Sequence, residues 1–130
     1  MIKKYKIEDL SPALQKLQRS KSEDDFFGIT SNGIDCIYFI KANDNFNIEF
    51  EVMDEEQKSF FRELERYAEN HDLPFILTTK NNQPLYKSDD PAPVIRFLTN
   101  SSIDRTIDIA KDIQETIFTH NSETFYNIVP

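Results

Sequence analysis

The alternation of apolar and polar positions predicts three helices along the chain. A short one follows Ser11-Pro12, with Ser11 as the N-cap, and buries Leu10, Leu14 and Leu17. A second follows a capping-box pair, Asp54 and Gln57. Its apolar stripe is Phe60, Phe61, Leu64, Tyr67 and Ala68. The last begins near Ser101 or Ser102 and repeats isoleucine or alanine at helical spacing up to Ile117.

The remaining apolar stretches predict strands. Residues 26–30 and 34–42 flank Asn32-Gly33, a pair that favours a tight type I′ hairpin turn. Residues 46–52 alternate strictly, with acids and amides between apolar side chains. Further strands are expected at 75–79 and 94–98, with a short edge strand at 85–87.

The predicted order is helix, three strands, helix, two or three strands, helix. Strands joined by hairpins favour an α+β fold with a mainly antiparallel sheet packed by helices. With 130 residues, the chain fits a single α+β domain spanning residues 1–130, including a basic N-terminal helical segment at about residues 1–22.

Charge is distributed unevenly. Residues 1–22 hold six basic and two acidic residues, a net charge of +4, whereas the rest holds nine basic and twenty-one acidic residues, a net charge of −12. An extended negative surface repels phosphate polymers and anionic lipid. We therefore expect no nucleic-acid or membrane partner, and a protein partner of basic character instead.

A single cysteine and an N-terminus without an apolar leader favour a cytoplasmic protein. The one cysteine, Cys36, lies in an apolar run, so we expect a buried thiol. The N-terminus has no apolar leader, and no stretch approaches the length of a membrane span. Asn-rich turns with abundant Ile and Lys favour a bacterial source.

Motifs for catalysis or cofactors do not stand out. Two glycines cannot build a phosphate-cradling loop, and one cysteine with His71 and His120 gives no spaced metal motif. The acid-rich stretches lack the ligand spacing of a calcium loop. We interpret both histidines as helix-ending residues. The expectation is no cofactor, no metal site and no catalytic residue.

Four residues remain candidates for a ligand or partner surface: Tyr38, Glu49, Glu51 and Arg96. Glu49 and Glu51 share one face of a strand, an arrangement that would suit a paired-carboxylate hydrolase. Arg96 stands alone in an apolar strand and could reach the same face. We favour a cross-strand salt bridge with one of the acids over the hydrolase.

These observations favour a non-enzymatic acidic protein-binding domain, such as a chaperone-like, adaptor or inhibitor/immunity-type protein. Its size, acidity and element order resemble those of bacterial type III secretion chaperones, and that resemblance implies a homodimer; the chain has none of their sequence motifs. The alternative is a small-molecule-binding protein or small enzyme with a pocket between sheet and helices.

Overall fold

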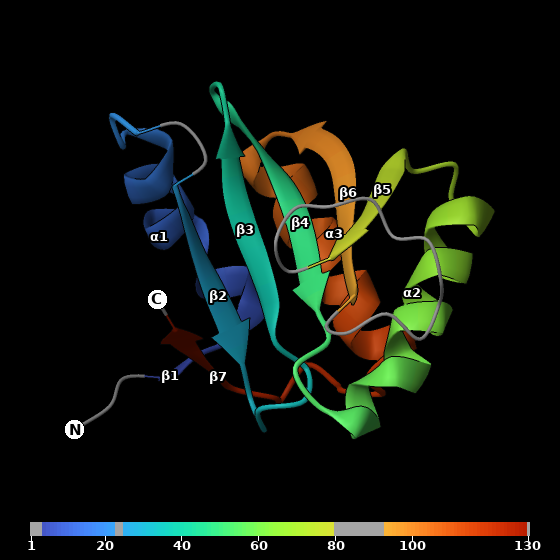
Figure 1. Ribbon diagram of the computed structural model, residues 1–130. Helices are drawn as coiled ribbons and strands as arrows, with labels where there is room; N and C mark the ends of the chain where they lie inside the picture. Colours follow the sequence, from blue (N-terminus) through green and yellow to red (C-terminus); the bar gives the residue numbers. More distant parts are fainter. Residues whose placement is uncertain (1–3, 23–24, 80–92, 130) are drawn as a thin grey trace.

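The fold is of the α+β class, as the sequence predicts (Figure 1). A computed structural model describes residues 4–22, 25–79 and 93–129. In this part of the chain, three α-helices and two short 3₁₀-helices accompany a seven-stranded antiparallel sheet. The predicted order of helices and strands agrees broadly with this arrangement.

The elements follow one another in this order: β1 Lys4–Tyr5, η1 Ile7–Asp9, α1 Ser11–Gln18, β2 Phe26–Thr30, β3 Ile37–Ala42, β4 Asn45–Glu51, η2 Glu55–Gln57, α2 Lys58–Asn70, β5 Phe75–Thr79, β6 Pro93–Ser101, α3 Ile103–Thr116 and β7 Tyr126–Val129. The short strand predicted at 85–87 lies outside the described residues.

The sheet has the strand order β1-β7-β2-β3-β4-β6-β5. Its centre follows the predicted hairpins, with β3 between β2 and β4. Two strands that the sequence analysis did not predict, β1 and β7, extend the sheet beyond β2. The two ends of the described chain therefore meet at this edge. These strands were not predicted because, with 2 and 4 residues, they are too short to show a periodic pattern.

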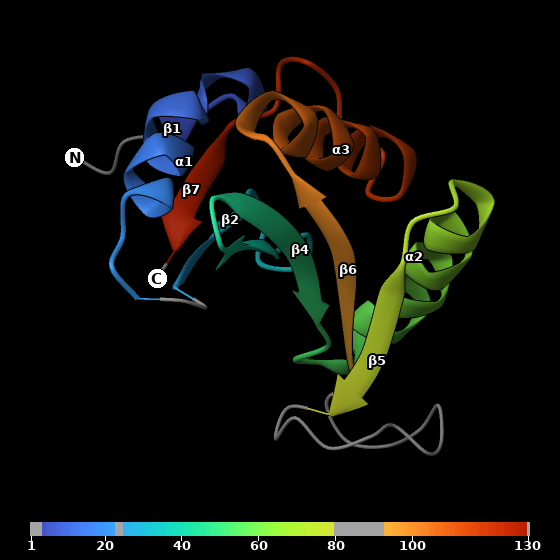
Figure 2. The same ribbon diagram turned by 90° about the horizontal axis from the view of Figure 1, so that it is seen from above.

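All three α-helices pack on one face of the sheet, and the sheet curves around α3 (Figure 2). The core forms there, because alternate side chains of β4 (Phe46, Ile48 and Phe50) point to the same side and are fully buried. Phe97 of β6 pairs with Ile48 and packs against Tyr67 of α2. No helix of the described chain covers the opposite face, which we call the outer face (Figure 2).

Local sequence signals mark where the two long helices, α2 and α3, begin. The Asp54–Gln57 capping box is present, and the Gln57 amide oxygen accepts the backbone N–H groups of Met53 and Asp54. At α3, the Ser102 hydroxyl accepts the N–H of Arg105. In α1, Ser11 is the first helical residue and not the predicted N-cap, because η1 runs directly into the helix through Leu10.

The predicted two-residue turn at Asn32-Gly33 is wrong. A loop of residues 31–36 joins β2 to β3. Gly33 has a φ of 86°, but Asn32 lacks the positive φ that a type I′ turn requires. The Asp35 carboxylate instead accepts the backbone N–H groups of Ser31 and Asn32, which widens the loop. Cys36 ends this loop and is buried, as expected.

Candidate docking groove

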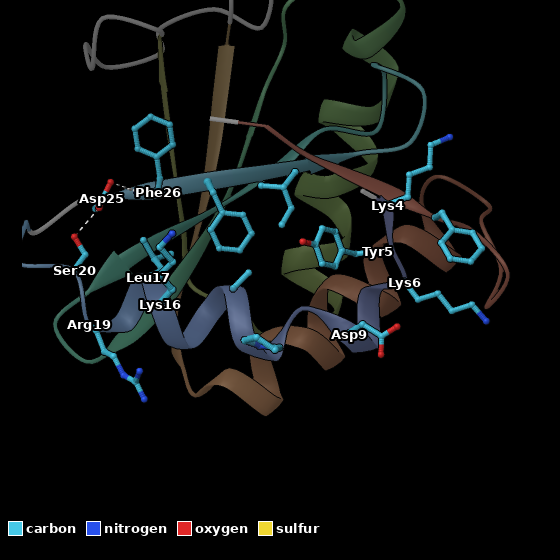
Figure 3. A pocket seen from close by; sticks show the side chains of 15 residues that line it. Lys4, Tyr5, Lys6, Asp9, Lys16, Leu17, Arg19, Ser20, Asp25 and Phe26 are labelled. Atoms are coloured by element: carbon cyan, nitrogen blue, oxygen red, sulfur yellow. Dashed lines mark hydrogen bonds between the residues drawn. The ribbon is translucent and has the colours of Figure 1, made fainter. Parts of the chain in front are cut away.

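An open groove of about 1120 Å³ lies between α1 and the edge of the sheet formed by β1, β7 and β2 (Figure 3). We call it the docking groove. Its apolar lining includes five side chains from these elements and the segment before β7: Tyr5, Leu17, Phe27, Phe125 and Ile128.

Exposed apolar side chains gather at this groove. Across the described residues, six large apolar side chains are exposed. Phe125 at 48% and Ile128 at 37% line the groove, whereas Phe26 at 51% borders it and turns its ring toward Tyr38 on the outer face. Single exposed apolar residues are ordinary on a protein surface, whereas exposed apolar side chains that line one concavity indicate a binding site. The groove therefore has the apolar component of a docking surface.

Basic side chains surround this apolar lining. Lys4, Lys6, Lys16 and Arg19 line the groove, against two acids, Asp9 and Asp25. The Lys6 ammonium lies 5.6 Å from the ring centre of Phe125, within the range of a cation–π contact. The groove therefore carries a positive lining on a chain whose net charge is −8.

Asp25 is already engaged by its own loop. The Ser20 hydroxyl donates to Oδ2 of Asp25 over 2.6 Å, and the backbone N–H of Phe26 donates to Oδ1 over 3.0 Å. These two hydrogen bonds hold the pKa of the Asp25 carboxyl below its usual value. The carboxylate thus links Ser20, which lies just beyond α1, to the first residue of β2.

The described part of the basic N-terminal segment packs on its own domain through its leucines. Leu10 and Leu14 are fully buried, and Leu17 is buried at the floor of the groove. The Lys41 ammonium of β3 donates to the carbonyl oxygen of Ser20, just beyond α1. One wall of the groove is therefore anchored to the sheet.

The four predicted surface residues lie elsewhere, on the outer face. Tyr38 of β3, Glu49 of β4 and Arg96 of β6 are direct cross-strand neighbours, and Glu51 lies opposite Val94. None of the four lines the docking groove. The structure therefore brings three of them into one row, apart from the concave site.

Glu49 and Arg96 form the predicted salt bridge. The Nε and Nη2 atoms of Arg96 lie 2.9 and 2.8 Å from the same oxygen, Oε1 of Glu49. Both side chains are partly exposed. Glu49 is thus occupied by a cation, which supports the structural interpretation over a pair of catalytic carboxylates.

Tyr38 packs on the outer face next to a glycine. A Cβ atom added at Gly28 would lie 2.7 Å from Cε1 of Tyr38, so the ring rests directly on the glycine backbone. Phe26 meets the same ring edge-on at 5.8 Å between centres. Burial raises the pKa of the Tyr38 hydroxyl to about 12. The side chain is neutral at physiological pH.

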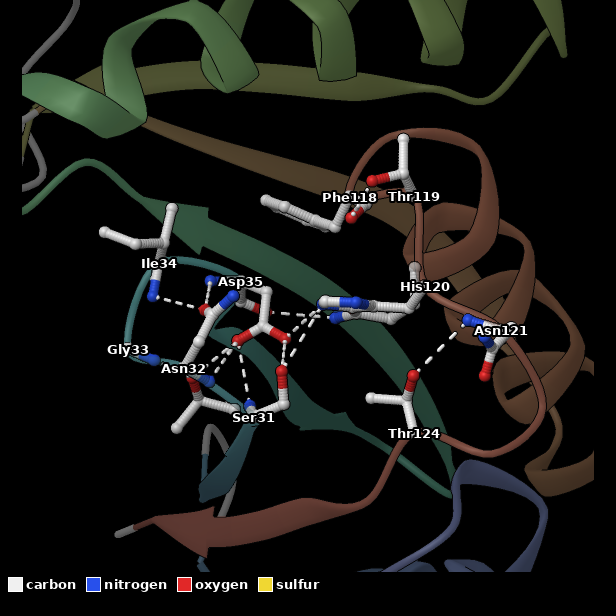
Figure 4. A network of polar contacts seen from close by, with 12 residues as sticks. Ser31, Asn32, Gly33, Ile34, Asp35, Phe118, Thr119, His120, Asn121 and Thr124 are labelled. Carbon is white, nitrogen blue, oxygen red and sulfur yellow. Dashed lines mark hydrogen bonds and ion pairs between the residues drawn. The ribbon is translucent and has the colours of Figure 1, made fainter.

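A second polar cluster, which the sequence analysis missed, centres on Asp35 (Figure 4). Its fully buried carboxylate accepts hydrogen bonds from the hydroxyls of Thr30 and Ser31 at 2.6 and 2.5 Å. His120 approaches from the far end of the chain, with Nε2 2.8 Å from Oδ2 of Asp35. The spacing of Ser31, Asn32 and Asp35 indicates a turn that is held by side chains, but nothing local indicates His120.

Ser31, His120 and Asp35 do not form a catalytic triad. In a triad, the serine and the aspartate bind opposite ring nitrogens of the histidine. Here both Ser31 Oγ, at 3.4 Å, and Asp35 Oδ2 lie at Nε2, and the Ser31 hydroxyl donates to Asp35. The cluster therefore fastens two loops together and does not activate a nucleophile.

The two histidines have different roles. His71 is the C-cap of α2, as predicted, and its ring packs on Tyr67 at 4.1 Å between centres. His120 follows the end of α3 by several residues, so its interpretation as the helix-ending residue is wrong. Its backbone N–H donates to the Gln114 carbonyl, while its ring reaches Asp35.

No family model, curated protein or solved structure matches this chain. Within residues 4–22, 25–79 and 93–129, no helix is both long and apolar enough to cross a membrane. The same part of the chain contains no group of three or more His, Cys, Asp or Glu side chains placed to hold a metal ion.

Proposed function

We propose that this chain is a non-enzymatic protein-binding domain that holds a segment of another protein in the docking groove. The observation that carries the proposal is the meeting of exposed Phe125 and Ile128 with four basic side chains in one concavity. Aromatic anchors with a surrounding polar rim are the usual composition of a protein interface.

The shape of the site supports a macromolecular partner. The groove between α1 and the strand edge is open to solvent, so a segment of another chain can enter it without unfolding the domain. Its walls are held in place by buried leucines of α1 and by the pairing of β7 with β1 and β2. A pre-formed site of this kind lowers the entropic cost of binding.

Affinity capture with a matched pair of variants tests the proposal. The groove variant carries Phe125→Ala and Ile128→Thr, and the control carries Met53→Ala and Leu98→Thr, which remove exposed apolar side chains outside the groove. Wild type and control should retain the same stoichiometric protein from native-host lysate, and the groove variant should lose it. Equal capture by the groove variant would contradict the proposal.

A second candidate, a small-molecule-binding protein, is favoured by the volume and mixed lining of the same groove. About 1120 Å³ is slightly above the range of about 300–1,000 Å³ that small-molecule sites occupy, and cations beside aromatic rings suit an amphipathic anion. Displacement of a fluorescent fatty acid from the purified protein measures whether the groove binds such an anion. Saturable binding that the groove variant loses, without any captured protein, would favour the small molecule.

A cytoplasmic location and a homodimer accompany the protein-binding proposal. Mass in solution, measured by sedimentation over a range of concentrations, tests the dimer. Native-host fractionation tests the location. A monomer would leave the groove proposal intact, because a single chain already forms the groove.

A further inference from the structure

We infer that the segment held in the docking groove is acidic at both of its ends and apolar in its middle. This inference rests on the proposed function and names the chemistry of the partner. It differs from the expectation drawn from total charge, which favours a basic partner, because the groove has a charge opposite to that of the chain as a whole.

The cations of the groove stand in two groups. Lys4 and Lys6 belong to the β1 end, and Lys16 and Arg19 belong to the C-terminal end of α1. Figure 3 shows the two groups at opposite ends of the groove, with Tyr5 between them. A segment lying along the groove would therefore meet positive charge first, then apolar surface, then positive charge again.

The acids nearby neutralise these cations only in part. Among the described residues that line the groove, four basic side chains stand against two acids, Asp9 and Asp25, which leaves an excess of positive charge. Lys6 has Glu123 as an acidic neighbour, but the two charges are 3.8 Å apart and Glu123 is 80% exposed. An exposed ion pair of this kind contributes little, so a carboxylate of a partner can replace it.

The distribution of charge also selects among acidic partners. Screening limits electrostatic attraction to about 8 Å at physiological salt, so a short acidic segment responds to the groove lining. A nucleic acid or an anionic bilayer extends far beyond the groove and meets more of the molecule, of which residues 23–130 carry a net charge of −12. A protein segment is therefore favoured over either of these polyanions.

Three short synthetic peptides test the inference by fluorescence anisotropy. They share one apolar middle containing Phe and Ile, and carry Asp-Glu, Asn-Gln or Lys-Lys at both ends. We expect the acidic peptide to bind at least about tenfold more tightly than the Asn-Gln peptide, with affinity that falls as salt rises. The Lys-Lys peptide should bind most weakly.

Charge reversal in the protein identifies the contact. Lys16→Glu with Arg19→Glu should lower the affinity for the acidic peptide about tenfold. It should raise the affinity for a peptide with Lys-Lys at one end. The control, Arg62→Glu with Arg66→Glu, makes the same charge change on exposed positions of α2, outside the groove. Should the reversed protein fail to fold by circular dichroism, Lys16→Gln with Arg19→Gln replaces it.

The outcomes separate this inference from the proposed function. Equal affinity for the acidic and Asn-Gln peptides, or equal weakening by the α2 control, overturns the acidic inference. If the acidic inference fails but the variant with Phe125→Ala and Ile128→Thr no longer binds the acidic and Asn-Gln peptides, the groove is still supported as a protein-binding site. If no peptide binds at up to about 1 mM while laurate does, the acidic inference fails and the small-molecule candidate is favoured over protein binding.

Discussion

His120 and Asp35 are 85 residues apart in sequence, yet Nε2 of the histidine lies 2.8 Å from Oδ2 of the aspartate. The contact ties the loop between β2 and β3 to the segment that leads from α3 into β7 (Figure 4). That segment also carries Phe125, and β7 carries Ile128. The Asp35 cluster therefore helps to hold one wall of the docking groove.

Removing the charge of Asp35 should destabilise the fold. Asp35→Asn keeps the shape of the side chain but loses the carboxylate that accepts from Thr30, Ser31 and His120. Because this group is fully buried, we expect the free energy of unfolding to fall by about 2–3 kcal/mol. Urea unfolding followed by circular dichroism measures the loss. An equal effect from Asp44→Asn, an exposed turn residue, would contradict this role.

The contribution of Asp35 should depend on pH. Burial alone would raise the pKa of its carboxyl, but the hydrogen bonds from Ser31, Thr30 and Asn32 together hold the pKa below its ordinary value of 3.8. A carboxyl with a lowered pKa stabilises the folded state above pH 3.8 and loses that contribution as the pH falls through the folded pKa. The difference between wild type and Asp35→Asn should therefore be constant near neutrality and shrink in acid. A gap that stays constant down to about pH 2 would contradict the prediction.

The salt bridge on the outer face should contribute little to stability. The side chains of Glu49 and Arg96 are 18% and 31% exposed, so solvent screens their attraction. A double-mutant cycle with Glu49→Gln and Arg96→Met should give a coupling energy below about 1 kcal/mol. Neither change should alter partner capture. Loss of capture with unchanged stability would instead place the binding surface on the outer face.

Gly28 should not tolerate a side chain. A Cβ atom there would lie 2.7 Å from Cε1 of Tyr38 and 2.9 Å from Cγ2 of Val129. Gly28→Ala should therefore lower the free energy of unfolding by about 1–3 kcal/mol through overpacking. Gly33→Ala is the comparison, since it meets open space and strains only a positive φ, at a cost of about 1 kcal/mol. Unchanged stability of Gly28→Ala would show that Tyr38 moves aside freely.

The sequence alone determined the elements that have strong local signals. The capping box at Asp54 and Gln57, the serines Ser101 and Ser102 and the long apolar stripes placed α2 and α3, because each signal lies within one turn or repeats over several. The strict alternation of β4 separated its buried and outward faces. That alternation also predicted that Arg96 would pair with one of the two acids, Glu49 or Glu51, and the strand pairing identifies Glu49.

The tertiary structure decided where a binding site could form. The docking groove needs β1 and β7, two short strands from opposite ends of the described chain, to pair beside β2. The contact of His120 with Asp35, which helps to hold one wall, likewise joins distant parts of the sequence. Such contacts depend on strand order and chain reversal, which local periodicity does not encode. The charge count located the basic N-terminal segment, but only packing of α1 against the folded sheet edge turned that segment into a basic wall beside exposed aromatic side chains.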